Sequence, residues 1–215
     1  MGFEKLKAVL PFRIRSFLIR IYSKKLLKDW KLNGCPIPPP HVVKENIIHE
    51  YREKTGIMLL IETGTFLGDM VEAQKKCFKK IISIELSLEL FNKAKRRFKR
   101  ERNVEIIYGD SGEILPRVLS KINDPAIFWL DGHYSEGNTA RGDTTCPVYK
   151  ELSAIFESKI PEYVILIDDA RCFTGEGDFP EIGKLTEFIK TRNANCEITN
   201  ENDIIRIVQH PENQL

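Results

Sequence analysis

Four short apolar runs in this 215-residue sequence each end in acidic side chains. These acids are Glu62, Glu85, Asp131 and the neighbouring pair Asp168 and Asp169. If each run is a buried strand, the acids lie at strand ends, where α/β proteins bind their ligands. Carboxylates there can accept hydrogen bonds from hydroxyl groups, hold a divalent cation or take a proton. The first hypothesis is therefore a ligand site at one edge of a sheet.

A glycine-containing loop follows the first of these acids. Glu62 is followed by Thr63, Gly64 and Thr65, and a second glycine, Gly68, stands just before an expected helix. Glycines let the backbone approach a ligand closely, and a helix N-terminus favours negative charge. A tight strand-to-helix turn would need the same glycines, so the loop alone does not establish a ligand. Its G-x-x-x-G spacing differs from G-x-G-x-x-G, which disfavours a dinucleotide and favours S-adenosylmethionine (SAM).

Two more strand ends support a nucleoside ligand. Glu85 lies 21 residues after Gly64, where a carboxylate can accept both hydroxyls of a ribose. The next expected strand ends in Gly109-Asp110-Ser111, which places another acid beside the same crevice. Three acidic strand ends in succession favour a binding site over a simple turn.

The elements that must position these residues alternate along the chain. We expect strands at 58–62, 80–85, 104–108, 126–131 and 163–169, helices at 69–78, 87–100, 147–158 and 179–191, and two last strands at 196–199 and 204–208. Alternating strands and helices predict a doubly wound, mostly parallel α/β sheet. The last two strands, around a turn at 200–203, predict an antiparallel hairpin at its edge.

These motifs resemble the successive SAM-binding motifs of class I methyltransferases, over roughly residues 45–208. The resemblance implies a seven-stranded Rossmann-like sheet that ends in the hairpin. It also implies that Glu62 and the Gly64 region hold the methionine part of SAM, that Glu85 holds the ribose, and that Asp110 and Ser111 lie near the adenine. The cofactor-binding candidates are Glu62, Thr63, Gly64, Thr65, Gly68, Glu85, Gly109, Asp110, Ser111 and Asp131.

The remaining acids predict a metal site. The strands that end in Asp131 and in Asp168 and Asp169 are neighbours in such a fold, so the three carboxylates should converge. They repel one another unless protons, arginines or a metal neutralise them, and oxygen ligands favour Mg²⁺, Mn²⁺ or Ca²⁺. The alternative is that Asp168 or Asp169 caps a helix and pairs with Arg171 or Arg141.

The acid pattern is similar to that of metal-dependent O-methyltransferases that act on sugars, of the macrocin and aminocoumarin type. In that group, an acid after the fourth strand and a paired acid after the fifth hold Mg²⁺, and Asp131, Asp168 and Asp169 match these positions. His133 departs from the pattern, because the sugar enzymes tend to have another acid there. We take Asp131 and His133 as catalytic candidates, since a histidine can accept the acceptor's proton; a structural histidine is the alternative.

The long, glycine-containing segment 132–146 predicts a mobile lid over the acceptor. Arg141, Arg171 and Tyr134 are the acceptor-binding candidates, because arginines can grip a phosphate or a carboxylate. The other interpretation is that the two arginines only balance the acidic cluster.

The first 40 residues differ from the rest. Residues 12–31 predict a basic amphipathic helix, and 33–40, with four prolines, predict a stiff linker before a methyltransferase domain at 41–215. The helix could pack on the domain, pack on a partner subunit in a homo-oligomer, or attach to an anionic membrane surface. The rest of the chain is net acidic, which argues against nucleic acid as a partner.

Composition narrows the alternatives. The scattered, odd number of cysteines disfavours disulfides and a zinc site, and with Arg13, Arg15 and Arg20 interrupting the first apolar residues we expect a cytoplasmic protein. The sequence favours metal-assisted O-methylation of a sugar, a glycan precursor or a phosphorylated small molecule, with SAM and Mg²⁺ or Mn²⁺ as cofactors. The alternatives are a SAM-binding protein without turnover and a nicotinamide-dependent oxidoreductase.

Overall fold

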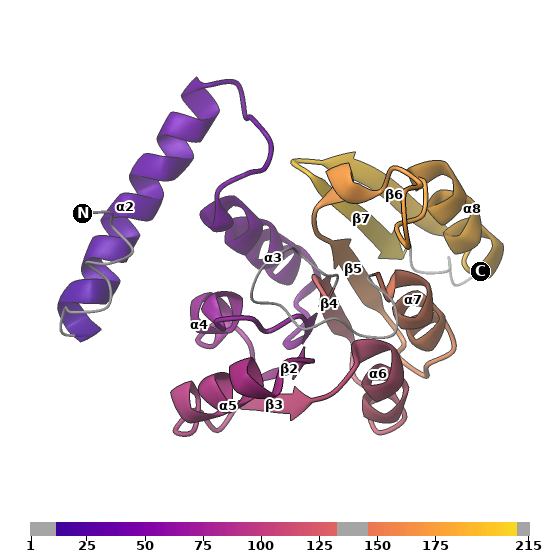
Figure 1. The fold of residues 1–215 in the computed structure, drawn as a ribbon, viewed down its shortest axis with the longest axis horizontal. Helices are drawn as coiled ribbons and strands as arrows, with labels where there is room; N and C mark the ends of the chain where they lie inside the picture. The colour runs from indigo at the N-terminus through magenta and orange to yellow at the C-terminus, as the bar shows by residue number, and fades with distance from the viewer. Residues whose placement is uncertain (1–11, 133–145, 210–215) are drawn as a thin grey trace.

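Seven strands form one mixed sheet at the centre of the computed structural model, which describes residues 12–132 and 146–209 (Figure 1). The strands are β1 (Leu59–Thr63), β2 (Lys80–Glu85), β3 (Val104–Tyr108), β4 (Ala126–Leu130), β5 (Tyr163–Ile167), β6 (Cys196–Glu201) and β7 (Ile204–Gln209). Their spatial order is β3-β2-β1-β4-β5-β7-β6; the first five are parallel, and β7 runs antiparallel to β5 and β6. This confirms the predicted fold class. The residues of β1, β4 and β5 are all buried, which explains why these strands read as continuous apolar runs.

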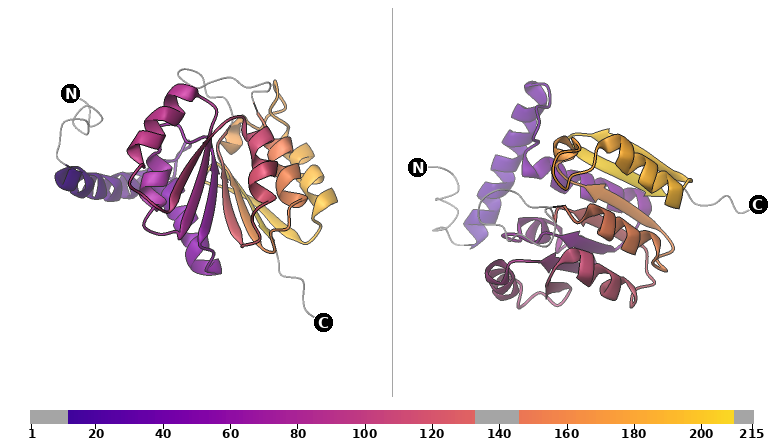
Figure 2. Two further views of the ribbon diagram at one scale, coloured as in Figure 1. Left: turned by 90° about the horizontal axis from the view of Figure 1, so that it is seen from below. Right: turned by 45° about the vertical axis from the view of Figure 1, so that its right-hand side comes forward.

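Helices cover both faces of the sheet (Figure 2). One face carries α2 (Phe12–Leu32), α3 (His41–Thr55), α4 (Asp69–Gln74) and α5 (Leu88–Arg97), and the other carries α6 (Ser111–Leu119), α7 (Val148–Phe156) and α8 (Ile182–Arg192). A short 3-10 turn, η1 (Ala170–Cys172), follows β5. Each layer packs its apolar side chains on the sheet as a separate hydrophobic cluster, so the sheet has a core on both sides.

Several elements differ from the sequence-based expectation. The sequence interpretation missed both α3 and α6. Helix α4 ends at Gln74, earlier than expected, and the Asn103 side chain donates to the carbonyls of Lys75 (2.7 Å) and Phe78 (3.0 Å) just beyond it. The last hairpin turns over two residues, Asn202 and Asp203, instead of four, and both have positive φ, as tight two-residue hairpins require.

Helix α2 stands away from the sheet along most of its length (Figure 1). Its C-terminal end is fixed to the domain, because Trp30 is buried against α3 and its indole Nε1 donates to the Pro36 carbonyl at 2.7 Å. The domain boundary at residue 41 stays a prediction, although α3 does begin there. None of the helices among the described residues combines the length and the apolarity needed to cross a membrane.

Candidate active site

The order of the sheet reverses between β1 and β4, and the loops after these two strands meet at its carboxyl edge. Gly64, directly after β1, has φ +83°, and a Cβ there would lie 2.7 Å from the carbonyl carbon of Asp131 and closer still to its oxygen. The Gly64 N–H donates to the Ile84 carbonyl at 2.9 Å. Only glycine therefore lets the loop after β1 lie flat against the end of β4.

Glu85, at the end of β2, is enclosed by the same loop. Its two carboxylate oxygens accept the backbone N–H groups of Phe66 (2.7 Å) and Ser87 (2.8 Å). Burial raises the pKa of Glu85, and the backbone N–H groups oppose that rise. Main-chain donors thus fix the carboxylate in place, and a carboxylate has further lone pairs that can accept two ribose hydroxyls.

Glu62 lies deeper, between the ends of β1 and β2. Its side chain is buried and accepts a hydrogen bond from the Ser83 hydroxyl, which in turn contacts the Thr65 hydroxyl at 2.5 Å. Burial, with smaller contributions from the negative charges of Asp131 and Glu85, raises the pKa of Glu62 to about 8 despite the Ser83 hydrogen bond. The carboxyl group is thus mostly protonated at neutral pH, and a cationic ligand placed beside it would favour its ionisation.

The end of β3 continues into α6. Asp110 caps this helix, since its side chain accepts the Gly112 N–H at 2.8 Å. Nearby, the buried Thr63 hydroxyl has no hydrogen-bond partner among the described residues, and it lies 3.1 Å from where a Cβ on Gly132 would be; the Ser111 hydroxyl lies 3.2 Å from the same point. A buried hydroxyl without a partner costs free energy, so a ligand that hydrogen-bonds to Thr63 would recover that cost.

Asp131, Asp168 and Asp169 converge as the sequence predicts. One ligand oxygen from each lies within 4.8 Å of the others. Burial raises the pKa of Asp168, Lys44 opposes that rise, and the charge of Asp169 adds to it. Asp169 has φ +53°, a left-handed conformation that turns the chain sharply after β5.

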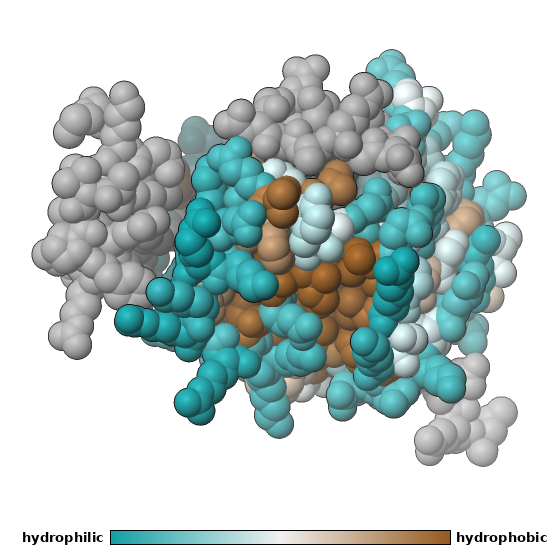
Figure 3. All heavy atoms as spheres, turned by 60° about the horizontal axis from the view of Figure 1, so that its bottom comes forward, coloured by the Kyte–Doolittle hydropathy of each residue, from teal (hydrophilic) through white to brown (hydrophobic). Residues whose placement is uncertain are grey.

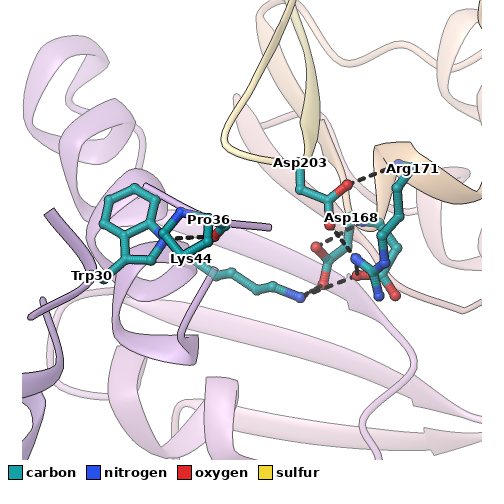
Figure 4. A network of polar contacts seen from close by, with 7 residues as sticks. Trp30, Pro36, Lys44, Asp168, Arg171 and Asp203 are labelled. Atoms are coloured by element: carbon teal, nitrogen blue, oxygen red, sulfur yellow. Dashed lines mark hydrogen bonds and ion pairs between the residues drawn. The ribbon is translucent and has the colours of Figure 1, made fainter. Parts of the chain in front are cut away.

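Two cations, Lys44 of α3 and Arg171 in the turn after β5, contact this acidic cluster (Figure 4). Lys44 of α3 forms an ion pair with Asp168 and a longer one, at 3.4 Å, with Asp169. Arg171 binds Asp169 at 2.8 Å and also pairs with Asp203 in the β6–β7 turn. Burial disfavours the charged form of Lys44, but the three carboxylates outweigh it and raise its pKa.

Sequence reasoning missed Lys44 and Asp203. The helical spacing of Val43, Ile47 and Ile48 after Pro40 could have indicated α3, but no local signal shows that Lys44 reaches an acid 124 residues away. Asp203 lies at an expected turn, where an acid is usually exposed; here it is buried and accepts the Arg171 N–H at 2.8 Å.

The structure places the remaining candidates as follows. Glu62, Thr63, Gly64, Thr65, Glu85, Gly109, Asp110 and Ser111 lie at the carboxyl ends of β1, β2 and β3. Gly68 lies at the start of α4, with φ +77° and the Phe98 ring where a Cβ would be, so packing alone requires glycine there. His133, Tyr134 and Arg141 lie outside the described residues, and their roles stay predictions.

No protein-family model and no curated protein matches the sequence. Solved structures do match it. SAH-bound PaMTH1, a methyltransferase of Podospora anserina, has a TM-score of 0.58 at 14% identity, over 94% of this chain and 99% of its own. The Bacillus cereus O-methyltransferase with SAH scores 0.58 at 12% identity (87% and 90% covered), and the Streptomyces achromogenes O-methyltransferase TomG with SAM scores 0.58 at 13% (87% and 89%). The chain therefore has the fold of class I SAM-dependent methyltransferases.

Proposed function

We propose that this protein is a SAM-dependent O-methyltransferase that acts on a hydroxyl group of a small molecule or glycan precursor. The observation that carries the proposal is the position of Glu62, Glu85 and Asp110 at three successive strand ends on one edge of the sheet, beside the acidic cluster. The similar structures with bound SAM or SAH support it, because they share the fold of this chain and open α/β sheets bind their ligands at the carboxyl ends of the strands.

The residues at the ends of β1 and β2, which we call the first site, fit SAM. SAM supplies a methyl group that its sulfonium already activates for displacement. The fixed Glu85 carboxylate suits the ribose hydroxyls, and the buried Glu62 suits the cationic methionine part. The Thr63 hydroxyl, which has no hydrogen-bond partner among the described residues, can bind the ligand, and the close approach at Gly64 holds the loop after β1 against the end of β4 beside it. This chain thus binds and orients the cofactor mainly through groups that are already in place.

The acidic cluster fits a divalent cation bound by oxygen. Asp131, Asp168 and Asp169 offer three carboxylates within reach of one ion, a donor set that suits Mg²⁺ or Mn²⁺. Such an ion, when bound, would lower the pKa of an acceptor hydroxyl and orient it. The ammonium group of Lys44 pairs with two of these acids. A metal-free alternative therefore has its own support: Lys44 would supply the positive charge beside the acceptor.

The chemical class of the acceptor follows from the polar side chains of the acidic cluster and its cations, which we call the second site. Sugars and phosphorylated small molecules carry the hydroxyl and anionic groups that aspartates, a lysine and an arginine can bind. Arg171 is already paired with Asp169 and Asp203, so it can position Asp169 as well as contact an acceptor. His133 stays our candidate for the base that takes the hydroxyl proton, with an expected loss of about 10²–10⁴-fold in turnover on its removal.

Calorimetry with SAH, SAM and NAD, followed by transfer of a labelled methyl group to a panel of sugars and phosphorylated hydroxyl compounds, tests the proposal. We expect SAM and SAH to bind in the micromolar range and NAD not to bind. Glu85→Ala should weaken SAM by about 1–3 kcal/mol, because it removes the acceptor for buried hydroxyls. Tight NAD binding without SAM binding would refute the proposal; SAM binding with no transfer to any acceptor would leave a binding protein.

A further inference from the structure

One face of the sheet joins two segments that are far apart in the sequence. Trp30 of α2, Ala94 of α5 and Phe98 directly after α5 belong to one hydrophobic cluster, together with residues of α3 and α4. Helices α2 and α5 therefore lie on the same side of the sheet, with α3 and α4 in the same layer (Figures 1 and 2).

Basic side chains gather on α5 and on the loops beside it. The exposed cations here are Lys76, Lys79, Lys80, Lys93, Lys95, Arg96, Arg97, Lys99, Arg100 and Arg102. Local acids pair with some of them: Glu89 with Lys93 at 2.6 Å and Glu105 with Lys80 at 3.3 Å. No ion pair with a described residue neutralises Lys76, Lys79, Arg96, Lys99, Arg100 or Arg102. In Figure 3, where the bottom of Figure 1 comes forward, hydrophilic side chains project around a hydrophobic area near the centre of the view.

The described part of α2 adds a second basic group. Lys24, Lys25, Lys28 and Lys31 are exposed, and Asp29 is the only acid in this helix. Apolar side chains are exposed beside them: Tyr22 is 36% and Leu32 74% exposed. An exposed helix with neighbouring basic and apolar side chains is typical of binding to a lipid surface.

The opposite layer differs in charge. Between α7 and β7, exposed acids such as Glu162, Glu176 and Glu187 lie among the basic residues. Among the residues whose side chains the structure describes, exposed basic residues thus outnumber exposed acids on the side of α2 to α5. The loops before β2 and β3, which carry Lys79 and Arg102, lie at the amino edge of the sheet, opposite the candidate active site. A surface bound at these loops would leave the carboxyl edge open to an acceptor.

We propose that this basic face, formed by α2 and α5 with the loops before β2 and β3, binds an anionic lipid bilayer. The bilayer supplies a continuous negative surface for two basic groups that are separate in the sequence. The apolar side chains of α2 favour the bilayer over nucleic acid, because they gain free energy by entering the headgroup region and have no such partner along a phosphate backbone.

The test is co-sedimentation of the full chain with vesicles of phosphatidylcholine alone and of phosphatidylcholine with phosphatidylglycerol. We expect binding only to the anionic vesicles, and weaker binding as salt rises, since screening shortens the reach of the charges. Replacing Lys76, Lys79 and Lys99 together by serine should weaken binding about 10²-fold, because each cation near the surface contributes a factor of about five. Replacing Lys24, Lys28 and Lys31 should do the same.

A matched control tests whether vesicle binding depends on the position of the lysines or only on the net charge of the protein. Lys150, Lys184 and Lys190 are exposed on α7 and α8 of the other layer, and replacing all three by serine removes the same charge. We expect this variant to bind vesicles within about twofold of the wild type. A loss in the control variant equal to that in the two basic-face variants would overturn the proposal, as would equal binding to neutral and anionic vesicles. Melting curves confirm that each variant is folded.

Nucleic acid is tested in parallel with a labelled 20-nucleotide RNA and fluorescence anisotropy. Replacing Tyr22 and Leu32 together by serine should weaken vesicle binding at least fivefold and leave any weak RNA binding unchanged. Tighter binding to RNA than to anionic vesicles, or vesicle binding that is insensitive to Tyr22 and Leu32, would overturn the assignment to a bilayer.

Discussion

The two halves of the sheet edge satisfy their acids in different ways. In the β1–β2–β3 half, Glu85 and Asp110 accept backbone N–H groups that lie close to them in space, from the loop after β1 and from the start of α6. In the β4–β5 half, Asp168 and Asp169 are held by the side-chain cations of Lys44 and Arg171. Main-chain N–H groups thus hold Glu85 and Asp110, whereas a hydroxyl holds Glu62. Charged side chains hold the acids of the β4–β5 half.

The difference teaches what each half can do. Main-chain donors are fixed by the fold, so Glu85 and Asp110 are held rigidly and keep lone pairs that a ligand could use. A lysine side chain can exchange its partners, so the second half can admit a metal ion or an acceptor that competes for the same oxygens. Substitutions in only one of the two halves should therefore change cofactor binding and methyl transfer separately.

The largest effect should come from Asp168. Asp168→Asn removes a ligand charge at nearly constant volume, so we expect methyl transfer to fall by at least about 10³-fold, with SAM affinity nearly unchanged. Excess EDTA should reproduce the loss, and Mg²⁺ or Mn²⁺ should restore it in the wild type. Single-turnover assays and calorimetry measure the two quantities. Full activity in EDTA would refute the metal mechanism and favour the Lys44 alternative.

Lys44→Met tests the ion pair of the β4–β5 half through the melting temperature of the protein. The substitution leaves the buried Asp168 without its cation, and breaking a buried ion pair typically costs about 3–5 kcal/mol. We expect a lower melting temperature, recovered in part by Mn²⁺, with a larger Mn²⁺-induced shift than in the wild type. The exposed pair of Lys54 and Glu50 is the control, since Lys54→Met should change the melting temperature little. An unchanged melting temperature in Lys44→Met would contradict the ion pair.

Gly64→Ala should damage the cofactor half. The new Cβ would overlap the Asp131 carbonyl group and oppose the positive φ, so SAM affinity should fall by about 10²-fold or more. Gly177→Ala is matched, because Gly177 also has positive φ but no atom within 4 Å of its Cβ position. That control should show only the conformational cost of about 1–2 kcal/mol in stability, with normal SAM binding. Equal SAM affinities in the two variants would show that the contact at Gly64 does not matter.

The smallest effect should be a pH dependence of SAM binding. The free protein holds Glu62 mostly protonated below its raised pKa of about 8, and the ionised carboxylate binds a cation better. Affinity should therefore rise as the pH rises, by about tenfold between pH 7 and pH 9 as the ionised fraction grows. Glu62→Gln should bind more weakly and lose this slope. A wild-type slope that persists in Glu62→Gln would assign the pH dependence to another group.

The sequence by itself determined the sheet and the edge at which the cofactor-binding candidates lie. Buried parallel strands appear as continuous apolar runs, and the acids at their ends necessarily share one edge, so β1 to β5 and the positions of Glu62, Glu85 and Asp110 could be predicted. The turn at Gly64 could be predicted as well, because its positive φ is local, whereas its close contact with the Asp131 carbonyl group could not.

Only the tertiary structure decided which cations neutralise the carboxylates of the second site. Lys44 reaches Asp168 across 124 residues, and Asp203 brings the last hairpin to Arg171, because α3 packs on the sheet and β7 pairs with β5. The same packing places α2 and α5 on one side and forms the basic face. Ion pairs between distant segments leave no periodic pattern in a sequence, whereas strands, turns and caps do, because local geometry alone determines them.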